Sequence, residues 1–173
     1  CEDGGIGEAH LVMPHQTHGT TVRQIAEDFV RLPENIRRMI LEGVDAVMTD
    51  VGGICIGVST ADCIPIIIYD PEHNAVATVH AGWRGTVARI VEEAIQAMAI
   101  TYHSKPEDMH SVIGPGISLE HFEVGQEVYE QFAEAGFDMD SISKWQTKWH
   151  IDLKECNRQQ LERMGVKPDH IEV

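Results

Sequence analysis

A nearly uninterrupted apolar run, Ile64 to Tyr69, is the feature that most constrains how this chain can fold. Consecutive apolar residues, rather than alternating ones, are typical of a central strand covered by helices on both faces. The polar, turn-forming stretch Asp70 to Asn74 separates this run from a second β-prone run, Ala75 to Val79. Two such runs joined by a turn predict a hairpin at the centre of the fold.

Beyond this hairpin the apolar spacing changes from that of a strand to that of a helix. Apolar residues from Val87 to Met98 recur every third or fourth position, which predicts one amphipathic helix. Further helices are expected after Pro33, across Gly125 to Ala135 and before Gly165. Strands are expected at Leu11–Met13, Val22–Ile25, Ala46–Met48, Ile54–Val58, Ser111–Ile113 and Trp149–Leu153. The predicted fold is a single α/β (α+β-like) domain over residues 1–173, with a mixed β-sheet between helical layers.

The composition excludes several classes of partner. The 173 residues carry 28 acidic and 13 basic side chains, a formal net charge of −15. Such a surface repels phosphate backbones, so we expect no nucleic-acid partner. No apolar stretch approaches the roughly 20 residues that cross a bilayer, no secretory leader is recognisable, and the four cysteines are scattered. We therefore expect a cytoplasmic protein that binds a small-molecule substrate and no membrane; composition predicts nothing about its oligomeric state.

Residues with metal-binding or nucleophilic chemistry stand at the ends of the predicted strands. Cys63 precedes the central strand and His80 follows its partner, so a hairpin would bring both to one open end. His18, between two short strands, would add a second imidazole. One thiolate with two imidazoles is a ligand set of catalytic zinc, whereas a thiol beside an imidazole is also the arrangement of a cysteine nucleophile. A lone cysteine is more commonly a small buried apolar residue.

The glycine-rich turn after His80 carries two further candidates. Trp83 offers a rigid aromatic plane, and Arg84 offers a permanent positive charge at a predicted helix start, where backbone N–H groups attract anions. An anionic or phosphate-bearing substrate could bind there. Each side chain could equally be structural, with Trp83 anchored in the core and Arg84 paired to one of the many acids.

Seven short motifs occur in the order seen in one protein family. They are Gln16-Thr17-His18-Gly19, Gly43 to Thr49, Ala61 to Ile66, Val79 to Gly85, Ile113 to Ile117, Phe122 to Gly125 and His150 to Leu153. On these residues the chain resembles the laccase-like polyphenol oxidoreductases, also called purine nucleoside phosphorylase or peptidoglycan editing factor proteins. The resemblance covers nearly the whole chain, and its specificity comes from three separated motifs that match together.

The resemblance implies a fold similar to the cysteine-hydrolase fold of certain deamidating toxins, and a metal, usually zinc, held by His18, Cys63 and His80. It also implies that N-terminal strands and a C-terminal segment of the intact family are missing from this sequence. The activities of the family are phosphorolysis of adenosine, inosine and methylthioadenosine, deamination of adenosine, and copper-dependent oxidation of phenols.

Physical chemistry ranks these activities. Multicopper oxidases use several copper ions and closely spaced His-x-His pairs, and this sequence contains no such pair. One mixed nitrogen and sulfur site suits zinc as a Lewis acid. The expected function is therefore a zinc-dependent purine nucleoside enzyme that uses a nucleoside and phosphate. The alternatives are a copper-dependent laccase-like polyphenol oxidase and a metal-free cysteine hydrolase or amidase, with peptidoglycan precursors as candidate substrates.

Each candidate residue receives a role in this interpretation. Catalysis is assigned to Cys63, His80 and Asp62, with Asp62 as the proton carrier. Binding of substrate or phosphate is assigned to Arg84, Gln16 and Trp83, and binding of the metal to His18, Cys63 and His80. In the metal-free alternative, His80 activates Cys63 and His18 only shapes the pocket.

Overall fold

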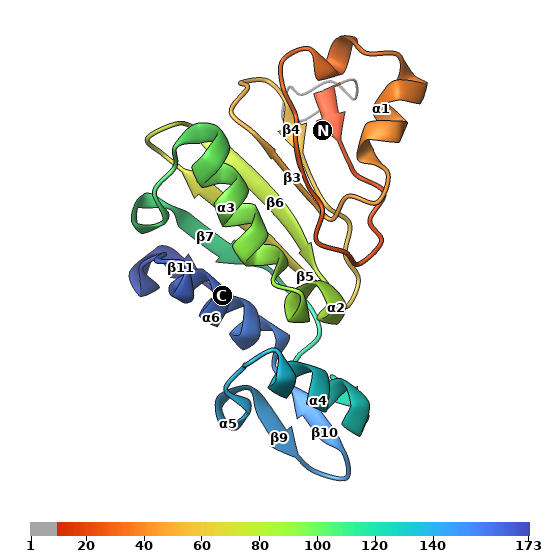
Figure 1. The fold of residues 1–173 in the computed structure, drawn as a ribbon, viewed down its shortest axis with the longest axis vertical. Helices are drawn as coiled ribbons and strands as arrows, with labels where there is room; N and C mark the ends of the chain where they lie inside the picture. The colour runs from red at the N-terminus through yellow and green to blue at the C-terminus, as the bar shows by residue number, and fades with distance from the viewer. Residues whose placement is uncertain (1–9) are drawn as a thin grey trace.

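A six-stranded mixed sheet organises residues 10–173, the part of the chain that this computed structural model describes (Figure 1). The strands in spatial order are β11 (Ile171–Glu172), β7 (His110–Ile113), β5 (Ile64–Asp70), β6 (Ala75–Ala81), β3 (Ala46–Thr49) and β2 (Val22–Gln24). The predicted hairpin is confirmed: β5 and β6 are antiparallel, with Ile64 opposite Ala81 and Asp70 opposite Ala75.

Two smaller sheets flank the central one. The first pairs β1 (Leu11–Val12) with β4 (Cys55–Ile56) in parallel. The second places β10 (Trp149–Ile151) between β8 (Glu123–Val124) and β9 (Ser143–Trp145), and it projects from the lower end of the molecule in Figure 1. The helices are α1 (Glu34–Leu41), α2 (Trp83–Val87), α3 (Ile90–Tyr102), α4 (Gln126–Glu134), α5 (Met139–Ile142) and α6 (Leu153–Arg163).

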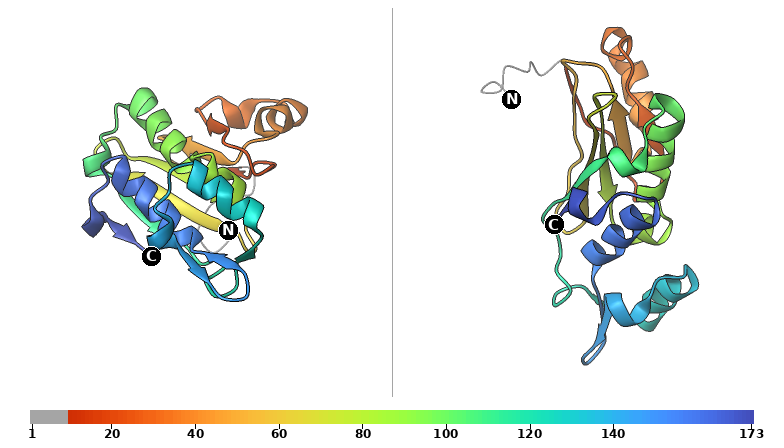
Figure 2. Two further views of the ribbon diagram at one scale, coloured as in Figure 1. Left: turned by 60° about the horizontal axis from the view of Figure 1, so that its bottom comes forward. Right: turned by 90° about the vertical axis from the view of Figure 1, so that its left-hand side faces the viewer.

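The main core lies between the sheet and the helices α3 and α6. Because side chains alternate between the two faces of a strand, Ile64, Ile66 and Ile68 of β5 all point toward these helices, and each is fully buried. They pack in one cluster with Ile90, Ala94 and Met98, among other residues. The right-hand view of Figure 2 shows the helices gathered on this side of the sheet.

The expectation that helices cover both faces of Ile64 to Tyr69 is wrong for the described residues. Ile67 is 47% exposed and Tyr69 is 39% exposed, although both are apolar and central. A second cluster, which includes Val47 of β3 and Ile25, packs the N-terminal segment and does not reach them. An apolar run predicts that both faces can be buried, but burial also needs a covering layer, which the pattern of one strand does not reveal.

The helix predicted across Val87 to Met98 is interrupted. Val87 ends α2, and α3 begins at Ile90 after Arg89, whose φ of 69° is left-handed. Arg89 donates a hydrogen bond to the carbonyl oxygen of Ala135 at 2.6 Å, and its guanidinium stacks on Phe137. These long-range contacts hold a conformation that few side chains adopt, so the apolar spacing alone could not predict the break.

Other predictions from the sequence are confirmed. The helix after Pro33 is α1, and α6 is followed by Gly165, whose φ of 103° suits glycine. Within residues 10–173 the three cysteines are free; Cys1 lies outside the described residues. Among the helices of this described part, none combines the length and apolar character that a bilayer crossing requires.

Candidate metal centre

The open end of the β5–β6 hairpin brings the predicted ligands together. Cys63 immediately precedes β5. His80 is the next-to-last residue of β6 and lies opposite Pro65. His18 reaches the same point from the loop between β1 and β2. One donor atom from each of the three side chains lies within 4.8 Å of the other two, and the imidazole rings of His18 and His80 stand edge to face at 4.9 Å. These three residues could therefore hold a metal ion.

The chemistry of the donor set fits a divalent metal. A tetrahedral zinc ion binds imidazole nitrogen and thiolate sulfur at about 2.0–2.3 Å, which separates neighbouring donors by roughly 3.5 Å. The three donor atoms lie within 4.8 Å of one another, so small side-chain movements would bring them to that spacing. His80 is buried, Cys63 is half-buried and His18 is exposed. The cluster therefore extends from the protein interior to its surface. Three protein ligands with an open fourth position are the arrangement of catalytic rather than structural zinc.

A buried carboxylate orients two of the three ligands. Oδ1 of Asp45 lies 2.8 Å from Nδ1 of His80, which leaves Nε2 of that ring for a metal. The same carboxylate accepts the backbone N–H groups of His18 and Gly19, each at 2.8 Å, and that of Thr17 at 3.2 Å. Burial raises the pKa of Asp45, but the hydrogen bonds from His80 and these backbone groups outweigh it, so the pKa lies below its usual range.

Two backbone features show how tightly the site is built. His18 has a φ of 63°, an uncommon left-handed conformation that the bonds to Asp45 hold in place. Gly82 lies against the ligands: a Cβ there would stand 2.9 Å from Cδ2 of His18 and 3.0 Å from Sγ of Cys63. Its own φ and ψ, −72° and 168°, suit any residue. A glycine at this position is therefore required by the close approach of His18 and Cys63, and not by the backbone conformation.

The environment of Cys63 does not favour a free thiolate. Burial, followed by the charges of Asp62 and Asp45, raises the pKa of the Cys63 thiol above its usual value. A cysteine nucleophile normally has the opposite shift, which a neighbouring cation provides. A bound metal cation would supply that charge and hold the sulfur deprotonated.

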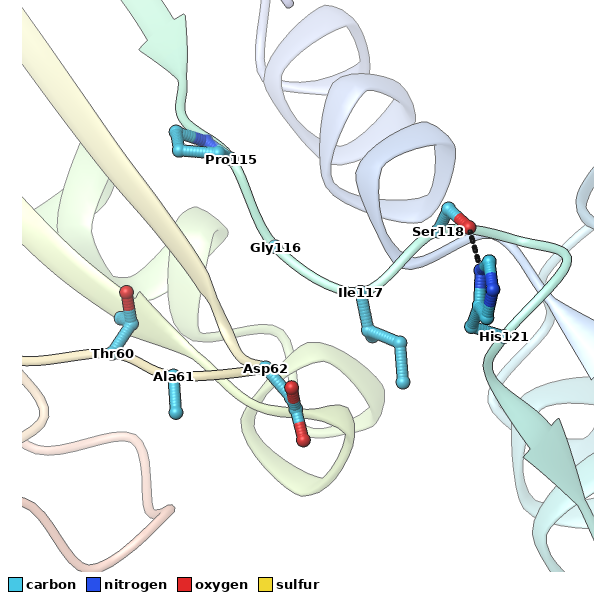
Figure 3. Close-up of a pocket in the computed structure, with 8 residues that line it drawn as sticks. All are labelled: Thr60, Ala61, Asp62, Pro115, Gly116, Ile117, Ser118 and His121. Atoms are coloured by element: carbon cyan, nitrogen blue, oxygen red, sulfur yellow. Dashed lines mark hydrogen bonds between the residues drawn. The ribbon is translucent and has the colours of Figure 1, made fainter.

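Two hollows lie beside the cluster and share Asp62 and Ile117. The smaller, of about 140 Å³, is mostly apolar and is lined by Asp62, Cys63, Trp83, Ile117, Phe122 and Leu153. The larger is a groove of about 660 Å³ between the loop Thr60 to Asp62 and the loop that runs from Pro115 to His121 (Figure 3). Ile117 donates its backbone N–H to the carbonyl oxygen of Asp62 at 2.8 Å, which ties the two loops together.

The remaining predicted site residues lie at different distances from this centre. Asp62 is exposed between the two hollows, and Trp83 lines the apolar one. Arg84 is exposed, with its guanidinium 4.3 Å from the centre of the Trp83 ring. The side-chain amide of Gln16 forms two hydrogen bonds with the backbone of Ser59, both at 2.7 Å. These bonds connect the loop of His18 to the segment before Cys63. The helix expected to attract anions, α2, has only five residues and a correspondingly small dipole.

Asp45 contacts two of the three candidate ligands, and its place within the motif Gly43 to Thr49 did not predict this. The missing information was the pairing of β3 with β6, which sets Ala46 opposite Val79 and so places Asp45 beside His80. An acid immediately before a buried strand was the one available signal.

The chain matches known proteins over most of its length. A family model described as multi-copper polyphenol oxidoreductase laccase matches residues 1–173. A purine nucleoside phosphorylase of Bacteroides thetaiotaomicron is 46% identical over 166 residues, covering 94% of this chain and 62% of the relative. The adenosine deaminase RL5 of an unknown prokaryotic organism is 41% identical over 170 residues, covering 96% of this chain and 64% of the relative. The chain thus spans less than two thirds of the length of these curated relatives.

Solved structures have the same fold. YlmD of Geobacillus stearothermophilus superposes with a TM-score of 0.88 at 28% identity, covering 99% of this chain and 65% of that one. The hypothetical protein YfiH of Bacillus licheniformis gives a TM-score of 0.86 at 29% identity, covering 99% of this chain and 66% of that one.

Proposed function

The chain belongs to the family described as multi-copper polyphenol oxidoreductase laccase, and from that membership and the site geometry we propose that it is a metal-dependent enzyme acting on purine nucleosides. The observation that carries the proposal is the convergence of His18, Cys63 and His80, whose donor atoms lie within 4.8 Å of one another. The names of the relatives support the substrate class: one is a purine nucleoside phosphorylase and another an adenosine deaminase.

We propose zinc as the metal. Two imidazoles and one thiolate suit its preference for nitrogen and sulfur ligands. When bound, it would supply Lewis acidity at the open coordination position. Asp45 holds His80 in the tautomer that keeps Nε2 free, because the hydrogen of Nδ1 is directed at the carboxylate 2.8 Å away.

The chain's own residues would divide the remaining work. The apolar hollow beside Cys63, with the rings of Trp83 and Phe122 in its lining, is suited to a flat purine base. Asp62 lines that hollow and is exposed, so its carboxyl oxygen can carry a proton to or from a purine nitrogen. Arg84, held against Trp83, is the cation closest in sequence to the cluster and would bind phosphate.

The decisive experiment combines metal analysis with nucleoside turnover. Metal content and conversion of inosine and adenosine are measured for the wild type and for His18→Ala, Cys63→Ala and His80→Ala, each with and without phosphate. We expect the metal to be lost and turnover to fall more than about a hundredfold in each variant. His15→Ala and Cys55→Ala are matched controls outside the cluster and should keep both. Normal turnover in all three cluster variants would refute the proposal.

The metal-free cysteine hydrolase is separated by a chelator and a thiol reagent. If the proposal holds, chelation abolishes turnover, and bound zinc protects Cys63 from alkylation. Full activity in the presence of a chelator, abolished by alkylation of Cys63, would instead support a nucleophilic thiol. Phosphate dependence of the reaction then distinguishes phosphorolysis from hydrolysis.

Oxidation of phenols is the second candidate, favoured by the description of the family and by the donor set itself. Two imidazoles and one thiolate also bind copper in blue-copper proteins. The sequence has no His-x-His pair of the kind that supports a trinuclear copper cluster. Oxygen consumption by copper-loaded protein with a phenol, compared with zinc-loaded protein, tests this candidate directly.

A further inference from the structure

The larger groove beside the metal cluster has a chemistry of its own. Its polar lining comes from Thr60 and Asp62 on one loop and from Ser118 and His121 on the other. Figure 3 shows these polar side chains coming from the two loops that meet at Ile117. At about 660 Å³ the groove is far larger than the apolar hollow of about 140 Å³ that it adjoins at Asp62. It can therefore hold a second, polar part of the same ligand.

The charge of the groove indicates which kind of ligand it takes. None of the described residues that line it is a lysine or an arginine, and Asp62 contributes a carboxylate. A phosphate group would be repelled by that carboxylate and would find no cation to offset it. Neutral hydroxyl groups, in contrast, can donate to the carboxylate and exchange hydrogen bonds with Thr60, Ser118 and His121.

His121 is held with one ring nitrogen available. Its Nδ1 lies 2.9 Å from Oγ of Ser118, which leaves Nε2 for a ligand. The turn is fixed by the backbone bonds from His121 and Phe122 to the carbonyl oxygen of Ser118, at 3.0 and 2.9 Å. From below, Nδ1 of His150, a buried residue of β10, donates to the carbonyl oxygen of Leu119 at 3.1 Å. A turn held in this way positions His121 before any ligand arrives.

We propose that this groove is the sugar subsite of the enzyme, and that Nε2 of His121 forms a hydrogen bond with one hydroxyl group of the ribose. The inference rests on the proposed nucleoside activity. With the base in the apolar hollow and the ribose in the groove, the glycosidic bond lies at their shared boundary beside Asp62. Phosphate then binds outside this groove, on the side of Arg84.

A double-mutant cycle between enzyme and substrate tests the contact. Steady-state kinetics of the wild type and His121→Phe are measured with inosine and with its 2′-, 3′- and 5′-deoxy analogues. Phenylalanine retains the ring volume and removes both nitrogens. For one of the three hydroxyls, removal should cost the wild type about three- to tenfold more in kcat/KM than it costs the variant. The effect should fall on KM for the nucleoside, with metal content and KM for phosphate unchanged.

Two further variants keep the test decisive. His110→Phe is the matched control, because His110 lies at the end of β7 away from the groove. This variant should discriminate among the analogues as the wild type does. Ser118→Ala should reduce the cost of removing the same hydroxyl as His121→Phe does, because it frees the imidazole of His121 to rotate. This variant also provides the test if His121→Phe fails to fold. Equal costs in the wild type and the His121 and Ser118 variants for all three hydroxyls, or a raised KM for phosphate in His121→Phe, would overturn the sugar subsite alone. A wild type that converts no nucleoside would instead refute the proposed function, and this inference with it.

Discussion

Oδ1 of Asp45 lies 2.8 Å from Nδ1 of His80, inside the protein, and the same carboxylate accepts three consecutive backbone N–H groups around His18. One buried side chain thus fixes the ring of one candidate ligand and the backbone of another. His18 and His80 come from segments that are far apart in the sequence, so their relative position depends on this carboxylate. Its effect on the site should therefore exceed that of an ordinary buried hydrogen bond.

Replacing Asp45 with asparagine should weaken metal binding while preserving the size of the side chain. The amide can donate toward Nδ1 of His80 and favour the wrong tautomer, and it loses the charge that the three N–H groups stabilise. Loss of such a supporting residue typically costs about 10- to 100-fold in metal affinity. Competition with a chelator measures the metal affinity of each variant. Asp169→Asn, an exposed acid far along the chain, is the control, and equal affinity in the two variants would contradict the role of Asp45.

Replacing Gly82 with alanine should separate metal affinity from folding. The added Cβ would meet Cδ2 of His18 and Sγ of Cys63 at 2.9 and 3.0 Å, so the two ligands must move apart. We expect metal affinity to fall about tenfold or more. The backbone at Gly82 suits alanine, so the free energy of unfolding of the metal-free protein should stay equal or rise by up to about 1 kcal/mol. Gly52→Ala, with open space around it, should leave affinity unchanged; a loss of affinity there as well would refute the steric argument.

The buried carboxylate of Asp70 should give stability its own dependence on pH. Burial raises the pKa of Asp70, but the nearby Ser104 hydroxyl and the hydrogen bonds from the ring of His73 and the backbone N–H groups of Glu72 and His73 outweigh it and hold the pKa below its ordinary value of 3.8. A folded-state pKa below the unfolded value stabilises the protein fully above pH 3.8, and this contribution is lost as the pH falls through the folded value.

The variant Asp70→Asn should therefore be less stable than the wild type by about 1–3 kcal/mol at neutral pH. The difference should narrow as the pH is lowered below about 4, because the wild type loses the contribution that the variant already lacks. Urea denaturation of the metal-free proteins across this range measures both curves. A difference that stays constant down to about pH 3 would show that the Asp70 carboxylate is not the titrating group.

The fold was largely predictable because its elements follow local periodicity. The hairpin of β5 and β6 is visible in two apolar runs and a turn, and with it comes the meeting of Cys63 and His80 at one open end. The break at Arg89 and the exposure of Ile67 and Tyr69 were not predictable. The break depends on contacts of Arg89 with Ala135 and Phe137. The exposure depends on which elements cover that face of the sheet. Neither can be inferred from the local spacing of apolar residues.

The site was predictable only in part, for a similar reason. His18 could be expected as the second imidazole from its own motif between two short strands, whereas the role of Asp45 follows from the pairing of β3 with β6. The groove between Asp62 and His121 joins loops separated by more than fifty residues. Such long-range pairings determine which polar side chains share a cavity, and a single sequence shows the side chains without the pairing.

Replacing Arg84 with glutamine should identify where phosphate binds. Arg84 is the exposed cation stacked on Trp83, which lines the apolar hollow, whereas the described lining of the larger groove contains no lysine or arginine. A charge-assisted hydrogen bond to phosphate contributes roughly 1.5–3 kcal/mol, so KM for phosphate should rise about tenfold to a hundredfold. Metal content and phosphate-independent deamination of adenosine should not change, because neither needs this charge. Arg163→Gln, on α6 and mostly exposed, is the matched control. If both variants keep the wild-type KM for phosphate, another group binds the anion and the assignment of Arg84 is wrong.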